Sequence, residues 1–103
     1  MKLLNIDHVP GKELEALGIV KGTVVHTKNV GRDFMAAMKT LVGGELVGYT
    51  QMLNEARQIA IKRMVDEAEE MGADAVINIR YGTSSVMSGA AEVIAYGTAV
   101  KIL

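Results

Sequence analysis

The feature that most limits the fold is an apolar stripe along residues 48–71. Nine apolar side chains recur there three and four residues apart: Tyr49, Met52, Leu53, Ala56, Ile59, Ala60, Met64, Ala68 and Met71. This spacing predicts one long amphipathic helix with a single buried side. Gly72 follows directly and predicts a left-handed stop. A helix of about six turns that is apolar on one side needs a sheet or another helix to cover it.

Strand patterns precede this helix. Residues 3–6 form a short candidate strand, which ends before a proline-glycine turn signal. Residues 13–27 are β-rich, but Gly18 and Gly22 interrupt the alternation. Such interruptions are typical of bulges or bends, so this segment is either one bent strand or two strands.

A further strand is expected directly after the long helix, in the segment "DAVINIRYGT" at residues 74–83. Its alternation predicts two faces. One face carries Ala75, Ile77, Ile79 and Tyr81, and the other carries Val76, Asn78 and Arg80. The polar side chains predict that one side of this strand is solvated.

The last strand, expected over residues 92–103, has no polar side. One face carries Ile94, Tyr96, Val100 and Ile102, and the other carries Val93, Ala95, Gly97 and Ala99. A strand that is apolar on both faces belongs at the centre of a sheet or against another subunit. We expect the first face to pack on the long helix and the face of small residues to be covered by another copy.

A shorter helix is expected over residues 33–42, with Asp33 in its first turn and the Gly43-Gly44 step at its end. Two helices followed by two strands predict one α+β domain over residues 1–103. Its expected fold is a small antiparallel sheet of three to four strands, covered on one face by the long helix plus the shorter helix.

Charge and composition exclude several function classes. Eleven basic and twelve acidic residues give a net charge of -1, which disfavours nucleic acid and anionic membranes as partners. The absence of cysteine excludes disulfides and thiolate chemistry and fits a reducing compartment. No signal peptide or spanning segment is recognisable, so a cytoplasmic location is expected. The hydrophobic share of 50% predicts apolar surface that partner copies cover.

The Gly43-Gly44 step before the long helix has two interpretations. It lacks the lysine and hydroxyl residue of a phosphate-binding loop and follows a helix, which favours a simple joint between helices. The alternative is an anion held by free amides near Gly48, with Arg32 or Arg57 nearby. Asp33 and Glu55, together with the two arginines, form either a buried ion-pair network or part of a catalytic site, and the network is favoured.

Other polar groups have simpler interpretations. Asp66, Glu69 and Glu70 lie on one helix face, where a solvated surface is favoured over a hard-cation site. Methionines at helical spacing are expected to fill the core. His8 and His26 lie on separate segments without metal-ligand spacing, so no metal ligands and no cofactor are predicted.

Several motifs together resemble the YbjQ-like family over nearly the whole chain. They are "GIVKGTVV", "RDF", "VGG", a tyrosine five residues after the second glycine, "EAR", and "MGADAV" running into a strand. The resemblance implies a dodecin-like α+β subunit, assembly as a ring of five, and the family label "putative heavy-metal-binding"; the family's biochemical function is not established. Its recurring positions fall here on Arg32, Asp33, Gly43, Gly44, Tyr49, Glu55, Arg57 and Gly72.

The function expected from these observations is a non-catalytic homo-oligomer, a pentamer by the resemblance, with a small anion or metal ion bound at subunit junctions. The residues expected to bind it are those family positions other than Gly72. The alternative is a small enzyme with an Arg/Asp/Glu/Tyr site near the helix joint. A pocket with convergent polar groups would favour the enzyme, whereas a fully paired charge network would favour the oligomer.

Overall fold

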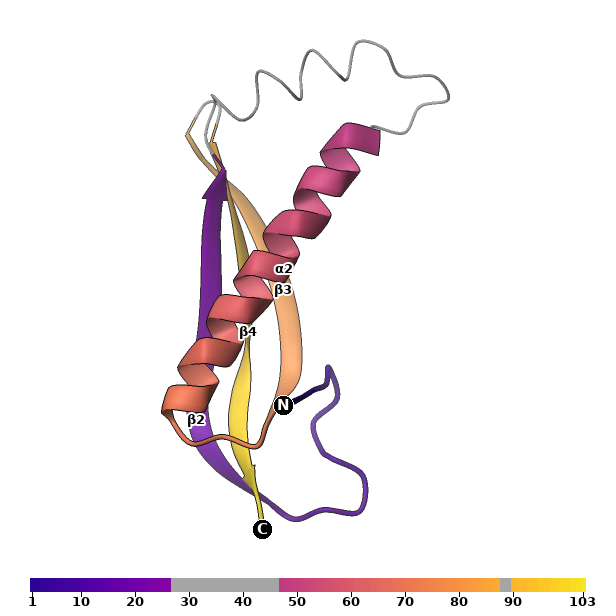
Figure 1. The fold of residues 1–103 in the computed structure, drawn as a ribbon, viewed down its shortest axis with the longest axis vertical. Helices are drawn as coiled ribbons and strands as arrows, with labels where there is room; N and C mark the ends of the chain where they lie inside the picture. Colours follow the sequence, from indigo (N-terminus) through magenta and orange to yellow (C-terminus); the bar gives the residue numbers. More distant parts are fainter. Residues whose placement is uncertain (27–46, 88–89) are drawn as a thin grey trace.

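The computed structural model describes residues 1–26, 47–87 and 90–103. Figure 1 shows how these residues fold. Their elements, in chain order, are β1 (Lys2–Leu3), β2 (Leu14–His26), α2 (Val47–Glu70), β3 (Ala75–Met87) and β4 (Ala90–Ile102). The predicted shorter helix over residues 33–42 and the Gly43-Gly44 step lie outside the described residues.

The strands form one four-stranded sheet in the order β1-β3-β4-β2. β4 pairs antiparallel with both β2 and β3, whereas β1 pairs parallel with β3, with Lys2 opposite Ala75 and Leu3 opposite Val76. The sheet is therefore mixed, and the prediction of an antiparallel sheet was wrong. Alternation along a strand shows which residues share a face, but it contains no information about the direction of the neighbouring strand.

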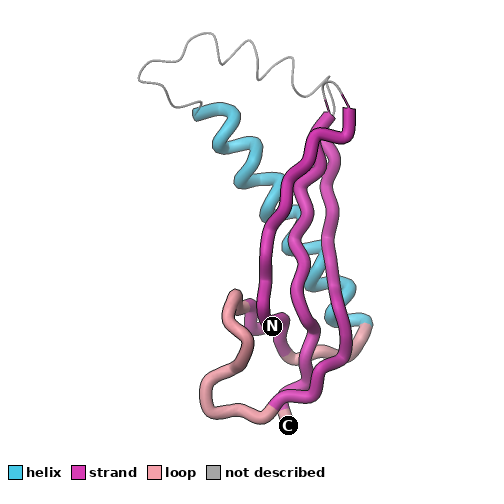
Figure 2. Tube along the Cα trace, turned by 180° about the vertical axis from the view of Figure 1, so that it is seen from behind, coloured by secondary structure: helices cyan, strands magenta, loops and turns pink. Residues whose placement is uncertain are grey.

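One long helix covers one face of this sheet. Figures 1 and 2 show α2 running obliquely across β2 and β4, with the strands in front of the helix in the view from behind. The part of the chain that the structure describes contains this helix alone, so the predicted fold of two helices on an antiparallel, dodecin-like sheet is corrected. The observed fold is one helix on a mixed sheet. The motifs that carry the family resemblance do not show how the strands pair, and the parallel pairing of β1 with β3 is visible only in the structure.

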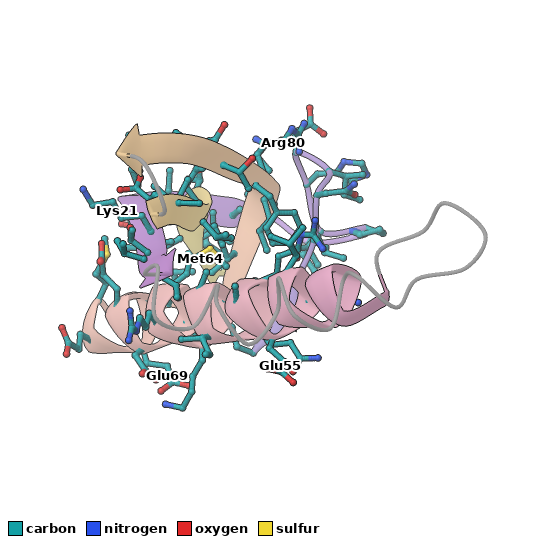
Figure 3. All side chains as sticks on the ribbon, turned by 90° about the horizontal axis from the view of Figure 1, so that it is seen from above. Lys21, Glu55, Met64, Glu69 and Arg80 are labelled. Atoms are coloured by element: carbon teal, nitrogen blue, oxygen red, sulfur yellow. The ribbon has the colours of Figure 1, made fainter. Side chains whose placement is uncertain are left out.

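Small side chains bring α2 close to the sheet. Ala56, Ala60, Met64 and Ala68, each four residues from the next, are fully buried. They form one core cluster with residues of β2, β3 and β4: Val20, Val24, Val76, Val93, Ala95 and Ala99. Figure 3 shows Met64 between the helix and the sheet. The stripe from Leu53 to Ala68 thus contributes to the core as predicted, although Ile59 within it and Met71 at its end are exposed; the side chains of Tyr49 and Met52 are not described.

β2 is one bent strand. Its register with β4 shifts between Ala16 and Gly18, and Gly18 has a φ of 145°, so an extra residue is accommodated there as a bulge. Gly22 has a different role. It lies directly under the helix, where an added Cβ would stand 2.6 Å from the backbone nitrogen of Met64. Close approach of the helix, and not a bend, requires glycine at this position.

A second bulge changes the faces of β3. The register with β4 shifts between Ile77 and Arg80, and Asn78 has a φ of 53°. Asn tolerates this left-handed conformation better than most residues. Because of the shift, Ile79 packs with the core cluster under the helix, while Ile77 packs in a separate cluster on the far side of the sheet. The predicted grouping of Ile79 with Ile77 was therefore wrong.

The faces of β4 are the reverse of the prediction. Val93, Ala95 and Ala99 lie under α2, whereas Tyr96 on the other face is 42% exposed. The small residues belong under the helix because α2 approaches the sheet closely, and a tyrosine there would force the two layers apart. Among the described residues, the far face is covered near the end of β4, where Val9 packs on Val100.

The end of α2 agrees with the prediction. Gly72 has a φ of 78°. Its amide donates to the carbonyl of Glu69 at 3.0 Å, and the amide of Ala73 donates to that of Ala68 at 3.0 Å. These two bonds are the Schellman pattern, which satisfies carbonyls of the last helical turn. β3 then begins within three residues.

Candidate functional site

Most of the residues predicted to bind a ligand are not placed by the structure. Arg32, Asp33, Gly43 and Gly44 lie outside the described residues. Tyr49 lies in the first turn of α2, but its side chain is not described. Their participation in a site therefore stays a prediction.

Glu55 and Arg57 lie on α2, two residues apart. Figure 3 shows Glu55 pointing away from the sheet, and its side chain is exposed. Arg57 is half-buried and donates from Nη1 to Oδ1 of Asn54 at 2.9 Å. Residues two apart on a helix point in different directions, so the structure does not bring Glu55 and Arg57 together. The predicted ion-pair network with Arg32 and Asp33 stays a prediction, since both partners lie outside the described residues.

No charged side chain in the described residues is buried. Lys62 Nζ lies 3.1 Å from Asp66 Oδ2 in an exposed pair on one helix face, and Glu69 and Glu70 are exposed, as expected for a solvated surface. Nδ1 of His8 lies 2.9 Å from Oδ1 of Asp7. This hydrogen bond and the charge of His8 lower the pKa of the Asp7 carboxyl below its usual value.

Sequence analysis predicted an uncovered sheet face but missed the residues that form it. The open face is the exposed far side of the sheet around Ile19, Lys21, Val25 and Tyr96. Ile19 is 79% exposed, Val25 50% and Tyr96 42%. In β2 these positions alternate with Val20 and Val24, which lie under the helix. Seen from behind, no described helix crosses this side of the sheet (Figure 2). The signal was present in the alternation of "GIVKGTVV" but was obscured by its two glycines.

A second missed feature is a groove at the β3 edge of the sheet, which we call the Arg80 groove. It has a volume of about 510 Å³. Its apolar lining comes from Leu3, Leu4, Ile61 and Ile79, and its polar lining from Asn5, Arg80 and Tyr81. These residues come from the N-terminal segment, α2 and β3, and nothing in their sequence spacing indicates that they meet.

Open edges accompany both features. β2 is the last strand of the sheet, so its outer edge has no strand partner among the described residues. The guanidinium of Arg63 on α2 donates to the carbonyl of Thr23 on β2. A single side chain thus satisfies one carbonyl of β2, while most of the strand edge stays accessible to another chain.

One long helix on a four-stranded mixed sheet, with one sheet face open, defines a small two-layer α+β domain. A family model described as "Putative heavy-metal-binding" matches residues 1–103. The chain belongs to this family, the YbjQ-like family, as its motifs predicted.

The relatives support the same assignment. The chain is 63% identical to a UPF0145 protein of Clostridium novyi over 103 residues, which is 100% of each chain. It is 58% identical to a UPF0145 protein of Thermotoga maritima, covering 99% of this chain and 97% of that one. A crystal structure of a protein of unknown function from Pediococcus pentosaceus, assigned to the DUF74 family, matches with a TM-score of 0.70 at 16% identity, covering 100% of this chain and 98% of that chain. At this identity the match shows the fold alone.

The donor groups do not fit the metal in the family description. Soft heavy metals prefer thiolate, thioether and imidazole ligands; the chain has no cysteine, two histidines and seven methionines, of which Met64 is buried in the core. Over residues 1–26, 47–87 and 90–103, no three His, Asp or Glu side chains lie close enough together to hold a metal ion.

No helix in the described part of the chain is both long and apolar enough to cross a membrane. Although α2 has 24 residues, charged side chains occupy its outer side. That side is the solvated one, as the salt bridge between Lys62 and Asp66 illustrates.

Proposed function

We propose that the chain is a non-catalytic subunit of a homo-oligomer that buries the open face. The observation that carries this proposal is the exposure of large apolar side chains on the same side of β2 and β4, with Ile19 at 79%. Large contiguous apolar patches on the surface of a soluble protein typically mark interaction sites. Tyr96 opposite Lys21 adds an aromatic side chain of the type enriched in interfaces.

A second copy is a suitable partner because the chain offers two different open edges. Among the described residues no strand pairs with the outer edge of β2, and the N-terminal segment bonds β3 only as far as Ile79, so the rest of that edge has no strand partner either. Pairing unlike edges of neighbouring copies is a heterologous contact, which closes into a ring when the rotation per copy allows it. The family resemblance predicts five copies.

The ligand and the location are further parts of this proposal. A small anion or metal ion at the subunit junctions is predicted from the family positions, of which Glu55 and Arg57 lie on α2. The enzyme alternative depends on Arg32 and Asp33, which lie outside the described residues, so it stays a prediction. A cytoplasmic location is proposed from the absence of cysteine in the sequence.

Light scattering coupled to size exclusion tests the oligomer. At micromolar concentration the wild type is expected to elute as a multiple of its 11.0 kDa chain mass. Ile19→Lys places a charge in the buried contact and should dissociate the assembly, since Ile19 is too exposed to matter to the core of one chain. Gln58→Lys adds the same charge at an exposed position on α2 and serves as the control. A wild type that elutes as a monomer refutes the proposal.

A further inference from the structure

The Arg80 groove has the size of a small-molecule site. Its volume of about 510 Å³ falls within the range of about 300–1,000 Å³ that is typical of ligand pockets. The groove lies at the edge of the sheet, where β1 ends at Leu3. Beyond Leu3 the N-terminal segment runs beside the bulge of β3. The amide of Asn78 donates to the carbonyl of Ile6 at 2.9 Å, and that of Ile79 to the carbonyl of Leu4 at 3.1 Å. These bonds hold the groove wall against β3.

The guanidinium of Arg80 is held in place at this wall. Its Nη1 donates to the carbonyl of Asn5 at 2.8 Å and to that of Ile79 at 3.0 Å. These two hydrogen bonds use both protons of Nη1. The N–H groups of Nε and Nη2, which point to the other side of the planar guanidinium, can donate to another acceptor. The ion pairs found in the described part of the chain involve Asp7, Asp66 and Asp74 but not Arg80.

Arg80 is the one charged residue among the described lining residues of the groove, and most of the others are apolar. Leu3, Leu4, Ile61 and Ile79 contribute hydrocarbon from three elements, and no carboxylate side chain is among the lining residues described. Tyr81 places a half-exposed phenol at the same site. Figure 3 shows Arg80 beside the N-terminal segment and well away from α2, so its charge lies at one side of the groove and the apolar side chain of Ile61 at another.

We propose that the Arg80 groove binds an organic monocarboxylate with an apolar body, such as a medium-chain alkanoate. The carboxylate accepts two parallel hydrogen bonds from the free side of the Arg80 fork, a geometry that the planar guanidinium matches. The hydrocarbon body lies on the leucine and isoleucine side chains and loses its contact with water. One cationic side chain complements a monoanion better than a phosphate dianion, which normally requires more than one positive group. This site lies within one chain and goes beyond the proposed assembly.

Titration of ¹⁵N-labelled protein with octanoate tests the proposal. Octanoate is expected to bind saturably and to shift amides at the groove, including those of Asn5, Ile79 and Tyr81. Acetate lacks the apolar body and octanol lacks the charge, so each should bind at least about tenfold more weakly. These titrations use the wild type in the assembly that it forms in solution, so the test of binding does not require the oligomer to be dissociated.

Three variants localise the binding. Arg80→Gln should weaken octanoate at least about tenfold, while Lys62→Gln removes the same charge from the outer side of α2 and should leave the affinity within about twofold. Because Arg80→Gln also loses the bond to Asn5, its folding is checked by its amide spectrum. Leu3→Gln, at a position already exposed, should weaken octanoate without altering the binding of acetate.

Three results would overturn the inference. The first is equal affinity for octanoate and octanol, and the second is a set of octanoate-induced shifts confined to the open face around Ile19 and Tyr96. The third is no saturable binding of octanoate; a changed assembly mass for Arg80→Gln would then indicate that a second copy occupies the groove. None of these results depends on whether Ile19→Lys dissociates the oligomer, so failure of this inference and failure of the proposed assembly are distinguishable.

Discussion

Replacing Gly22 by alanine is expected to be strongly destabilising, because at this position the backbone of α2 rests on the sheet. A Cβ added to Gly22 would lie 2.6 Å from the nitrogen of Met64 and 2.9 Å from the carbonyl carbon of Ala60, and it would overlap the carbonyl oxygen of Ala60. Ordinary contact begins at 3.4 Å. All three obstacles are backbone atoms of a regular helix, so no side-chain rotation relieves them.

The helix must therefore move away from the sheet by on the order of 1 Å, and a gap of that size removes about a quarter to a half of the dispersion energy of each contact. The affected layer contains the buried side chains of Ala60 and Met64 and, beneath them, Val20 and Val24. Overpacking typically costs about 1–3 kcal/mol, and an immovable backbone obstacle places this case near the upper end, at about 3 kcal/mol. At about 4 °C or more per kcal/mol, the melting temperature should fall by about 12 °C or more.

Thermal and urea unfolding followed by circular dichroism measure this cost, at a fixed protein concentration because an oligomer unfolds in a concentration-dependent way. Gly82→Ala is the matched control. It removes the same backbone freedom from the unfolded chain, but its Cβ would meet one side-chain atom, Cγ2 of the half-buried Ile94 at 3.1 Å, so a shift of a few tenths of an ångström relieves the contact. We expect it to cost less than about 1 kcal/mol. Gly22→Ala melting within about 3 °C of Gly82→Ala would refute the close approach of α2 to β2.

Two further predictions concern the end of α2 and the role of metal. Gly72→Val should lower the free energy of unfolding by about 1 kcal/mol or more, because valine is strained at a φ of 78° although its Cβ would meet nothing within 4 Å; a variant as stable as the wild type in urea would contradict the Schellman ending. Chelator should leave the melting temperature unchanged, since the chain has no cysteine and its described residues form no cluster of metal ligands. Stoichiometric zinc or copper that is lost with unfolding would contradict this second prediction.

Some of the candidate sites were accessible to sequence reasoning and others were not. The family positions, including Glu55 and Arg57, follow from motifs, because a motif is a local string of residues. The Arg80 groove joins Leu3, Ile61 and Arg80, which are separated by many residues and have no common spacing. Only the return of the N-terminal segment beside β3 brings them together, and no periodicity within a segment indicates that return.

The sequence by itself determined the long helix, its buried Ala and Met stripe and its end at Gly72, because helical periodicity and a left-handed glycine act over a few neighbouring residues. It also determined the family, through motifs spread over the whole chain. The tertiary structure alone decided that β1 runs parallel to β3 and that the small face of β4, with Ala95 and Ala99, lies under α2. Alternation shows that a strand has two faces, but which face is covered depends on how closely distant segments can approach. In this fold that approach depends on Gly22, where a single missing Cβ allows the helix to lie on the sheet.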